Sequence, residues 1–368
     1  MITNYEVLSV EKAVSTLSEF YSEAIKSNAD FKEIPSVMLW GAPGVGKSQG
    51  VRAIAKSIEK QTGKKVCVTD VRLLLFNPID LRGIPTANAE KTLAVWLKPK
   101  IFQMDDSPDV VNILFLDEIS AAPQTVQAAA YQITLDRTVG EHRLPDNCLV
   151  MAAGNRVTDK SVAYKMPKAL ANRLMHFEIE GSFTSWQRWA LRSGINERVL
   201  GYLSFRNDRL FGFDASSNDL AFATPRSWEM VSNVLKYTNN DLKLAKPLIS
   251  GLIGCGAAIE FCTWCNVFDN MPSIEGIFQG SETSVPKATD ILYAVVYGMT
   301  SYAREHLDDK IGIGNSLRYA RKMPYDFANL LVLNYKSFEE EKDESFLLGV
   351  PEYADLMTRM GEVGNGNQ

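Results

Sequence analysis

A glycine-rich segment at residues 41–48 has the composition and spacing of a phosphate-binding loop. It fits the pattern G-x-x-x-x-G-K-[ST], in which backbone N–H groups surround a β-phosphate and the following helix directs its positive end at the same group. In this pattern Lys47 would reach the β- and γ-phosphates, and Ser48 would ligate Mg²⁺. The predicted nucleotide-binding residues are Gly41, Ala42, Pro43, Gly44, Val45, Gly46, Lys47, Ser48 and Gln49.

Two consecutive carboxylates, Asp117 and Glu118, end the apolar run that begins at Val110. Successive residues at the end of a strand point in different directions, so the two acids can hold different roles. Asp117 would hold Mg²⁺ opposite Ser48, usually through water. Glu118 would orient and polarise an attacking water as a general base. The alternative is a capping pair before the next helix, an interpretation that the upstream phosphate-binding loop disfavours.

Asn155 follows another apolar run, Leu149 to Ala153, in the sequence Gly154-Asn155-Arg156. Its amide would hydrogen-bond both the γ-phosphate and the lytic water. Taken alone, an asparagine at the end of a strand is usually a turn residue. Its importance therefore depends on whether it lies beside the phosphate-binding loop.

The elements that must position these residues alternate between strand and helix patterns from about residue 30 to 180, which predicts a parallel sheet flanked by helices. The phosphate-binding loop follows one such strand and precedes a helical pattern from Gln49 to Lys60, so a chance glycine-rich turn is disfavoured. Ligands of open α/β sheets bind outside the carboxyl ends of the strands, so the polar residues there should gather in one crevice. The predicted strands are Val37 to Trp40, Lys65 to Thr69, Ile113 to Leu116, Leu149 to Ala153 and Met175 to Ile179.

The pattern becomes helical from Ser185 onward, which predicts a separate all-α lid. We therefore expect an α/β nucleotide-binding core at residues 1–183, a helical lid at 184–270 and a helical C-terminal extension at 271–368. A loop is expected over 266–288, and a disordered tail over 361–368. The further predicted helices are Asp290 to Leu307, Ser316 to Lys322 and Tyr325 to Lys336.

The composition is that of an ordinary globular protein of 368 residues, with 46% hydrophobic residues and a net charge of −5. No apolar run approaches the roughly 18 to 20 residues of a membrane span. The N-terminal residues lack the pattern of a secretory signal, so we expect a cytoplasmic location and no membrane partner. The acidic balance makes nucleic acid an unlikely partner by bulk charge alone.

The order of the motifs resembles that of the AAA+ ATPases, and within them of the MoxR family. Residues 41–48 are similar to Walker A, residues 114–118 to Walker B, and Asn155 to sensor 1. The segment Pro167 to Leu174 is similar to the one that carries the family's arginine finger, which would make Arg173 the finger. Residues 223–228 resemble sensor 2, with Arg226 as its arginine. The similarity runs from about residue 10 to 270.

Two further segments resemble pore elements of the MoxR-containing clade. Residues 77–85, continuing to Trp96, resemble its helix-2 insertion, and residues 134–144 resemble the hairpin that precedes sensor 1. In such ATPases both face the channel of a ring, and the alternative is two surface loops without substrate contact. The residues we would test there are Arg82, Arg137 and Arg143.

This chain departs from the family pattern at two places. Walker B continues into Ile119-Ser120 where many members carry Asn-Arg, and the finger segment reads Asn172-Arg173-Leu174 rather than Asp-Arg-Phe. Either difference would alter contacts between subunits without touching hydrolysis.

The resemblance implies a Mg²⁺-dependent ATPase that assembles into a homo-oligomeric ring, by family habit a hexamer. A neighbouring subunit would supply Arg173, and a finger of this kind can contribute roughly 10³ to 10⁵ in rate. The partner it implies is a protein to be remodelled, activated or assembled, often one with a von Willebrand A domain. The first alternative is a nucleic-acid-dependent motor of the same clade, which the lack of an aromatic and basic strip disfavours. The second is a small-molecule kinase, in which the finger and sensor 2 segments have no place.

Overall fold

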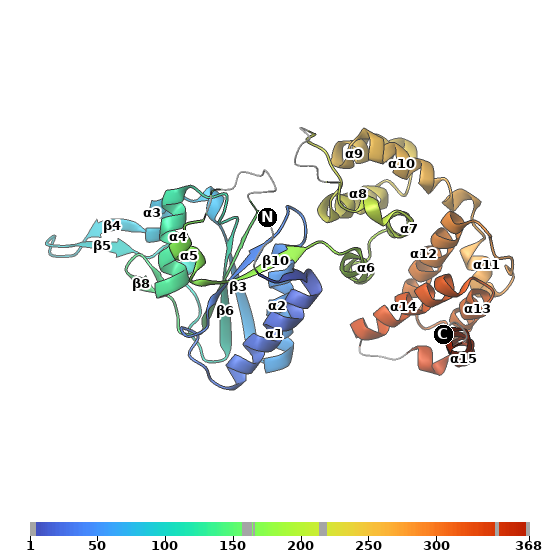
Figure 1. The fold of residues 1–368 in the computed structure, drawn as a ribbon, viewed down its shortest axis with the longest axis horizontal. Helices are drawn as coiled ribbons and strands as arrows, with labels where there is room; N and C mark the ends of the chain where they lie inside the picture. Colours follow the sequence, from blue (N-terminus) through green and yellow to red (C-terminus); the bar gives the residue numbers. More distant parts are fainter. Residues whose placement is uncertain (1–4, 157–163, 165, 213–218, 343–345, 366–368) are drawn as a thin grey trace. The chain divides into compact units, whose positions relative to one another are not determined.

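The computed structural model describes residues 5–156, 164, 166–212, 219–342 and 346–365. The chain divides into two compact units, Met1–Ser182 and Phe183–Gln368. The first combines a sheet with helices and is drawn in blue to green in Figure 1; the second, in yellow to red, is helical over its described residues.

A six-stranded sheet, parallel at every strand pair, is the centre of the first unit. Its strands, in sheet order, are β1 (Val7–Ser9), β10 (Leu174–Glu180), β2 (Ser36–Trp40), β9 (Cys148–Gly154), β6 (Val110–Asp117) and β3 (Lys65–Arg72). All the strands expected from apolar runs are present, each longer than predicted. The edge strand β1 is an addition that the sequence did not indicate. The predicted fold class, a parallel sheet flanked by helices and followed by an all-α region, is confirmed.

Helices cover both faces of this sheet (Figure 1). They are α1 (Val10–Lys26) and α2 (Lys47–Thr62) on one face and α4 (Gln124–Asp136) on the other. Strand side chains alternate between the faces: Ile113 packs in the core of α1 and α2, and its neighbour Leu114 in the core of α4. Because both faces are covered, every residue of β6 before Asp117 is buried, as expected for a central parallel strand.

Two small antiparallel hairpins extend from the first unit. One joins β4 (Ile84–Ala87) to β5 (Ala94–Leu97), and the other joins β7 (Thr138–Val139) to β8 (His142–Arg143). The short helices η1 (Leu73–Leu75) and α3 (Pro78–Arg82) precede the first hairpin, and η2 (Lys100–Phe102) follows it. A further short helix, α5 (Lys168–Ala171), precedes β10. The second hairpin is shorter than predicted, because Thr134 to Asp136 are the last turn of α4.

The second unit has two apolar cores. The first core is built mainly by α6 (Phe183–Arg192), α7 (Glu197–Phe205), α8 (Pro225–Tyr237), α9 (Leu242–Ile253), α10 (Cys255–Cys265) and η5 (Phe268–Asn270). The short helix η4 (Asn207–Arg209) follows α7 and has no buried residue. The second is built by α11 (Ile274–Gln279), α12 (Thr289–Glu305), α13 (Lys310–Ala320), α14 (Tyr325–Lys342), η6 (Leu347–Gly349) and α15 (Pro351–Asn365). Helix α12 joins the two, because its Tyr297 packs in the first core and Val295 in the second.

Three expectations for this unit need adjustment. The expected loop over 266–288 contains α11, and α13 begins at Lys310, ahead of the predicted Ser316. Helix α15 runs to Asn365, so residues 361–365 are helical rather than disordered, and the end of the predicted tail lies outside the described residues. In the described part of the chain, none of the helices combines the length and apolar character of a membrane span.

Candidate nucleotide-binding site

Three neighbouring strands bring the predicted chemical residues to one edge of the sheet. Strands β2, β9 and β6 are adjacent, and their register pairs Trp40 with Gly154 and Leu116 with Ala152. The N–H of Gly41 donates to the carbonyl of Gly154 at 3.3 Å, which ties the start of the glycine-rich loop to the end of β9. The segments that follow these three strands therefore converge at their carboxyl ends.

The glycine-rich loop has a backbone that suits an anion. Gly44 and Gly46 have φ of 80° and 99°, in the left-handed region that favours glycine. Gly46 is the N-cap of α2, and no described side chain caps this helix end. Its first N–H groups and the positive end of its dipole therefore face the loop, as in phosphate sites. A Cβ at Gly41 would lie 2.6 Å from the carbonyl oxygen of Ile179, so only glycine fits there.

Lys47 connects the loop to the predicted sensor. Its Nζ donates to the carbonyls of Gly41 at 2.7 Å and Ala42 at 3.0 Å, and to Oδ1 of Asn155 at 3.0 Å. Because an ammonium can only donate, the amide of Asn155 must turn its oxygen to Lys47 and its Nδ2 donor elsewhere. Asn155 thus lies beside the phosphate-binding loop, where its amide N–H₂ can meet a phosphate oxygen or a water.

Ser48 and Asp117 form the pair expected of a Mg²⁺ site. The Ser48 hydroxyl donates to Oδ2 of Asp117 at 2.8 Å, and Oδ1 of Asp117 accepts from the N–H of Glu118 at 2.9 Å. A hydroxyl and a carboxylate in contact are hard oxygen ligands of the kind that Mg²⁺ prefers beside phosphates. The donor set therefore fits this metal, with Ser48 and Asp117 as the residues that would hold it directly or through water.

Glu118 has an unusual backbone for its residue type. Its φ is 58°, in the left-handed region, where a non-glycine residue is uncommon and often lies at a functional site. Its side chain is half-buried and makes no hydrogen bond or ion pair with the described residues. The carboxylate is thus available to accept a proton from a water, as a general base must.

Ser120 is a residue of this site that sequence reasoning treated only as a departure from the family. Its buried hydroxyl accepts from the N–H of Asn155 at 2.9 Å. A Cβ at Gly154 would lie 2.7 Å from this hydroxyl, so the two segments are in close contact. Ser120 therefore fixes the backbone of Asn155, and its place two residues after Glu118 was the available signal.

Arg173 lies in the turn between α5 and β10. It is exposed and makes no ion pair or hydrogen bond with the described residues. No described side chain therefore fixes the position of its guanidinium. This is the arrangement that a finger acting on another subunit would have.

The two remaining predicted residues lie on helix starts. Gln49 is exposed in the first turn of α2. Arg226 is exposed in the first turn of α8, in the second unit, where Thr224 caps the helix by accepting from the N–H of Ser227. Their roles toward a nucleotide stay predictions.

The segment that forms this site is similar to a known protein family. Residues 36–176 match the family model described as "ATPase family associated with various cellular activities (AAA)", and the match spans β2 to β10 with all the strand-end residues. Over 153 residues the chain is 28% identical to the chaperone MoxR1 of Mycobacterium tuberculosis, covering 40% of this chain and 37% of that protein. Residues 36–176 are thus similar to an AAA ATPase, and part of the chain is similar to a MoxR protein.

A second curated relative covers a similar part of the chain. It is 32% identical over 154 residues to the uncharacterized protein YeaC of Bacillus subtilis, 41% of this chain and 43% of that one. The match thus spans about two fifths of the length of each curated relative. Among solved structures, a mutant of RuvB from Thermotoga maritima aligns over 79% of this chain and 84% of its own, with a TM-score of 0.36 and 13% identity.

The two segments predicted to be pore elements contact each other. Nε2 of His142 in β8 lies 2.8 Å from the carbonyl of Trp96 in β5, and a Cβ at Gly140 would lie 2.7 Å from the carbonyl of Arg82. Arg82 and Arg143 are exposed. The β7–β8 turn is thus held against the base of the β4–β5 hairpin.

Arg137 does not have the exposed position that we expected. It is the C-cap of α4 with φ of 52°, is 6% exposed, and donates through Nη2 to the carbonyl of Ile34 at 2.7 Å. Burial lowers the pKa of its guanidinium. Arg137 therefore fixes the end of α4 inside the fold and cannot contact a substrate, which corrects the prediction.

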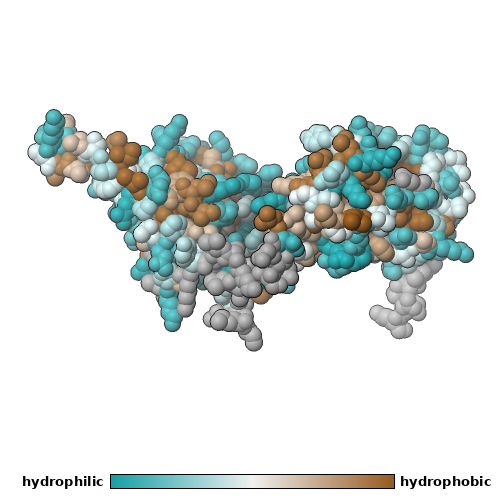
Figure 2. All heavy atoms as spheres, turned by 90° about the horizontal axis from the view of Figure 1, so that it is seen from above, coloured by the Kyte–Doolittle hydropathy of each residue, from teal (hydrophilic) through white to brown (hydrophobic). Residues whose placement is uncertain are grey.

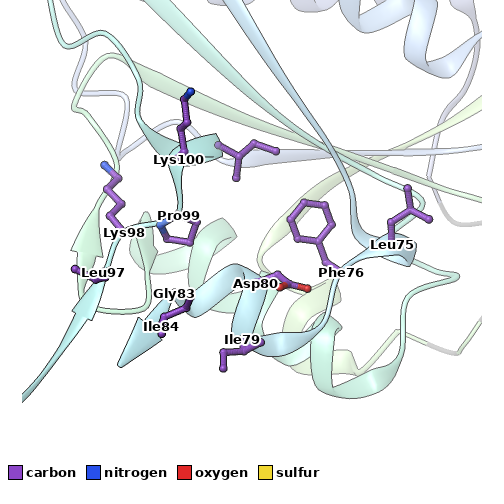
Figure 3. A pocket seen from close by; sticks show the side chains of 11 residues that line it. Leu75, Phe76, Ile79, Asp80, Gly83, Ile84, Leu97, Lys98, Pro99 and Lys100 are labelled. Atoms are coloured by element: carbon purple, nitrogen blue, oxygen red, sulfur yellow. The ribbon is translucent and has the colours of Figure 1, made fainter. Parts of the chain in front are cut away.

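The β4–β5 hairpin presents apolar side chains to solvent, and Figure 2 shows hydrophobic residues along this projection. Its exposed apolar residues are Ile84, Leu93, Val95 and Leu97. A pocket of about 710 Å³ lies at its base, where Phe76, Ile79 and Pro99 come together (Figure 3). Lys98 and Lys100 lie at the same pocket. The hairpin therefore combines apolar contact area with positive charge.

Proposed function

We propose that this chain is an ATPase that hydrolyses ATP to ADP and phosphate with Mg²⁺. Mg²⁺ held by Ser48 and Asp117 would neutralise charge on the phosphates. Lys47 would bind the β- and γ-phosphates, Asn155 would hydrogen-bond the γ-phosphate, and Glu118 would orient and deprotonate the water. Phosphoryl transfer needs little else than positioning and charge stabilisation, and these side chains are suited to both.

We further propose that the active form is a homo-oligomeric ring, a hexamer by family resemblance. The observation that carries this proposal is the contrast between Lys47, which donates to Gly41, Ala42 and Asn155, and Arg173, which is exposed without a partner among the described residues. An arginine supplied by a neighbour completes the charge stabilisation. Interfaces of this head-to-tail kind close into rings. Arg226 of the helical unit would sense the nucleotide.

The ring would use ATP to remodel, activate or assemble a protein partner. The name of the relative MoxR1, a chaperone, supports this class of substrate. The exposed apolar residues of the β4–β5 hairpin supply a surface that an unfolded or extended segment could contact. By resemblance, the partner carries a von Willebrand A domain.

Mixing two inactive variants tests the shared site. Arg173→Ala subunits keep their own Glu118 but lack the finger, and Glu118→Gln subunits keep the finger but lack the base. Each alone should release phosphate at least about 100-fold more slowly than the wild type. Mixed rings should regain activity, because Arg173 of a Glu118→Gln subunit can serve the site of an Arg173→Ala neighbour.

Lys168→Ala is the matched control, since Lys168 is an exposed cation on the same segment. It should retain wild-type turnover, which separates the finger from the general charge of the segment. Mixtures that stay inactive although both variants bind ATP and assemble together would contradict the shared site.

The partner class is tested with the Glu118→Gln ring, which should bind ATP without turning it over. A purified von Willebrand A domain protein should associate with this ring in ATP and dissociate in ADP, measured by co-elution in size-exclusion chromatography. Equal association in both nucleotides, or in none, would oppose this partner while leaving the ATPase proposal intact.

A further inference from the structure

Three aromatic side chains, Tyr5, Trp40 and His176, form a stack next to the start of the glycine-rich loop. The imidazole of His176, in β10, contacts Tyr5 and Trp40, with ring centroids 5.9 Å and 6.1 Å apart and interplanar angles of 29° and 12°. Trp40 is the last residue of β2 and immediately precedes Gly41. His176 thus packs against the strand end from which the phosphate-binding loop begins.

His176 makes two hydrogen bonds, one as an acceptor and one as a donor. Nε1 of Trp40 donates to Nδ1 of His176 at 2.9 Å, and Nε2 of His176 lies 2.7 Å from the carbonyl of Ala171. Because an indole N–H can only donate, Nδ1 must be the acceptor, and the proton of the neutral ring lies on Nε2. His176 therefore donates to Ala171 and connects it to Trp40.

The carbonyl that receives this hydrogen bond belongs to the segment that carries Arg173. Ala171 is the last residue of α5, which has four residues. One turn of helix is not stable by itself, so its position must come from contacts with the rest of the fold. Arg173 follows two residues later, exposed at the turn. The hydrogen bond from His176 thus helps to fix the position of the residue that precedes this turn.

An ion pair supports the stack from the side of the predicted sensor. Arg156, the residue after Asn155, pairs with the carboxylate of Glu178, which is 7% exposed. Glu178 is opposite Trp40 in the register of β10 and β2. Burial and the charge of Glu178 raise the pKa of the Tyr5 phenol, and the charge of Arg156 lowers it. His176 and its neighbours therefore connect the end of β2, the segment after β9 and the end of α5.

We propose that His176 is a positioning residue for the arginine finger: it ties the turn bearing Arg173 to the strand end that carries the phosphate-binding loop. This inference rests on the proposed ring ATPase and adds to it the residue that orients the finger. His176 would act in the subunit that donates Arg173, and not on the nucleotide of its own chain.

Two variants separate the hydrogen bonds from the packing. His176→Phe keeps a ring in the stack but removes both hydrogen bonds, and His176→Gln keeps one acceptor and one donor on an amide. His176→Phe should bind ATP within about 2-fold of the wild type and turn it over roughly 10- to 100-fold more slowly. His176→Gln should recover most of that loss.

Mixed rings then show in which subunit His176 acts. Excess Glu118→Gln subunits have an intact His176 and Arg173, so they should restore turnover at the sites of His176→Phe subunits as they do for Arg173→Ala. Rescue of Arg173→Ala without rescue of His176→Phe would overturn this proposal and leave the shared site standing. Rescue of neither would overturn both.

Trp40→Phe provides a second variant if His176→Phe does not assemble. It removes the indole donor, keeps an aromatic ring, and should be rescued by the same Glu118→Gln subunits. A variant that loses ATP affinity as much as turnover, and is not rescued in the mixture, would show that the stack serves its own nucleotide site and would contradict the positioning role.

Discussion

At the scale of residues, the predicted site divides into side chains with protein partners and side chains without them. Lys47, Ser48 and Asp117 are held by hydrogen bonds within the first unit. Glu118 and Arg173 have no partner among the described residues. The first group is suited to binding, because a binding site needs side chains that are already in place. The second is suited to catalysis, because its side chains would contact the attacking water and the charge that develops in the transition state.

Replacing Lys47 tests the binding group. Lys47→Ala removes the ammonium that would contact the phosphates, and hydrogen bonds to charged groups are worth about 1.5 to 3 kcal/mol. We expect ATP affinity to fall by about 10- to 100-fold, measured by titration with a fluorescent nucleotide. Lys56→Ala, an exposed lysine on the same helix, should bind ATP as the wild type does. Equal losses in both variants would contradict the assignment.

Replacing Glu118 tests the catalytic group. Glu118→Gln keeps the shape and removes the base, so phosphate release should fall by about 10²- to 10⁴-fold while ATP affinity changes little. Glu59→Gln, at an exposed position of α2, controls for the loss of one negative charge. Turnover that survives in Glu118→Gln would mean that another group activates the water.

At the scale of elements, the sequence predicted what local patterns encode. The central strands are largely apolar runs, because a parallel strand covered on both faces is buried throughout. Asp117 ends β6, Asn155 follows β9, and the glycine-rich loop that leads to Lys47 follows β2. Strand β1 has three residues, and its pairing with β10 is a long-range contact without a local pattern. The roles of Ser120 and His176 likewise depend on partners distant in sequence.

Arg137 is the residue for which local reasoning failed, and its burial leads to a prediction. Arg137→Ala removes the hydrogen bond to Ile34 inside the fold and should lower the free energy of unfolding by about 1 to 3 kcal/mol. Arg143→Ala, in the same hairpin region but exposed, should change it by less than about 0.5 kcal/mol. Urea unfolding of both variants measures the difference. Similar stabilities would contradict the structural role of Arg137.

The base of the β4–β5 hairpin offers a second test at this scale. Gly83 has φ of 94°, and a Cβ there would lie 2.0 Å from the carbonyl oxygen of Leu97. Gly83→Ala should therefore destabilise the fold by about 1 to 3 kcal/mol through backbone strain and displacement of β5. Gly256→Ala, at a helical position with open space around the added methyl, should be neutral or slightly stabilising. Thermal unfolding that ranks the two variants the other way would contradict this geometry.

At the scale of the whole molecule, we expect that one chain does not complete the site. The predicted phosphate-binding residues lie in the first unit, Arg226 lies in the second, and Arg173 is exposed on the first. Sequence motifs predicted these three groups, because each is a short local pattern. The motifs did not indicate which contacts fix the turn after α5. Those contacts come from His176 and the rings around it.

The most direct test of the ring ATPase is phosphate release per chain measured against protein concentration, with the size of the assembly determined in ATP at each point. We expect that specific activity rises cooperatively as rings form, and that dilute monomers are at least about 100-fold less active because they lack the neighbouring arginine. Full specific activity in a chain that remains monomeric at every concentration would contradict the shared site and the function proposed from it.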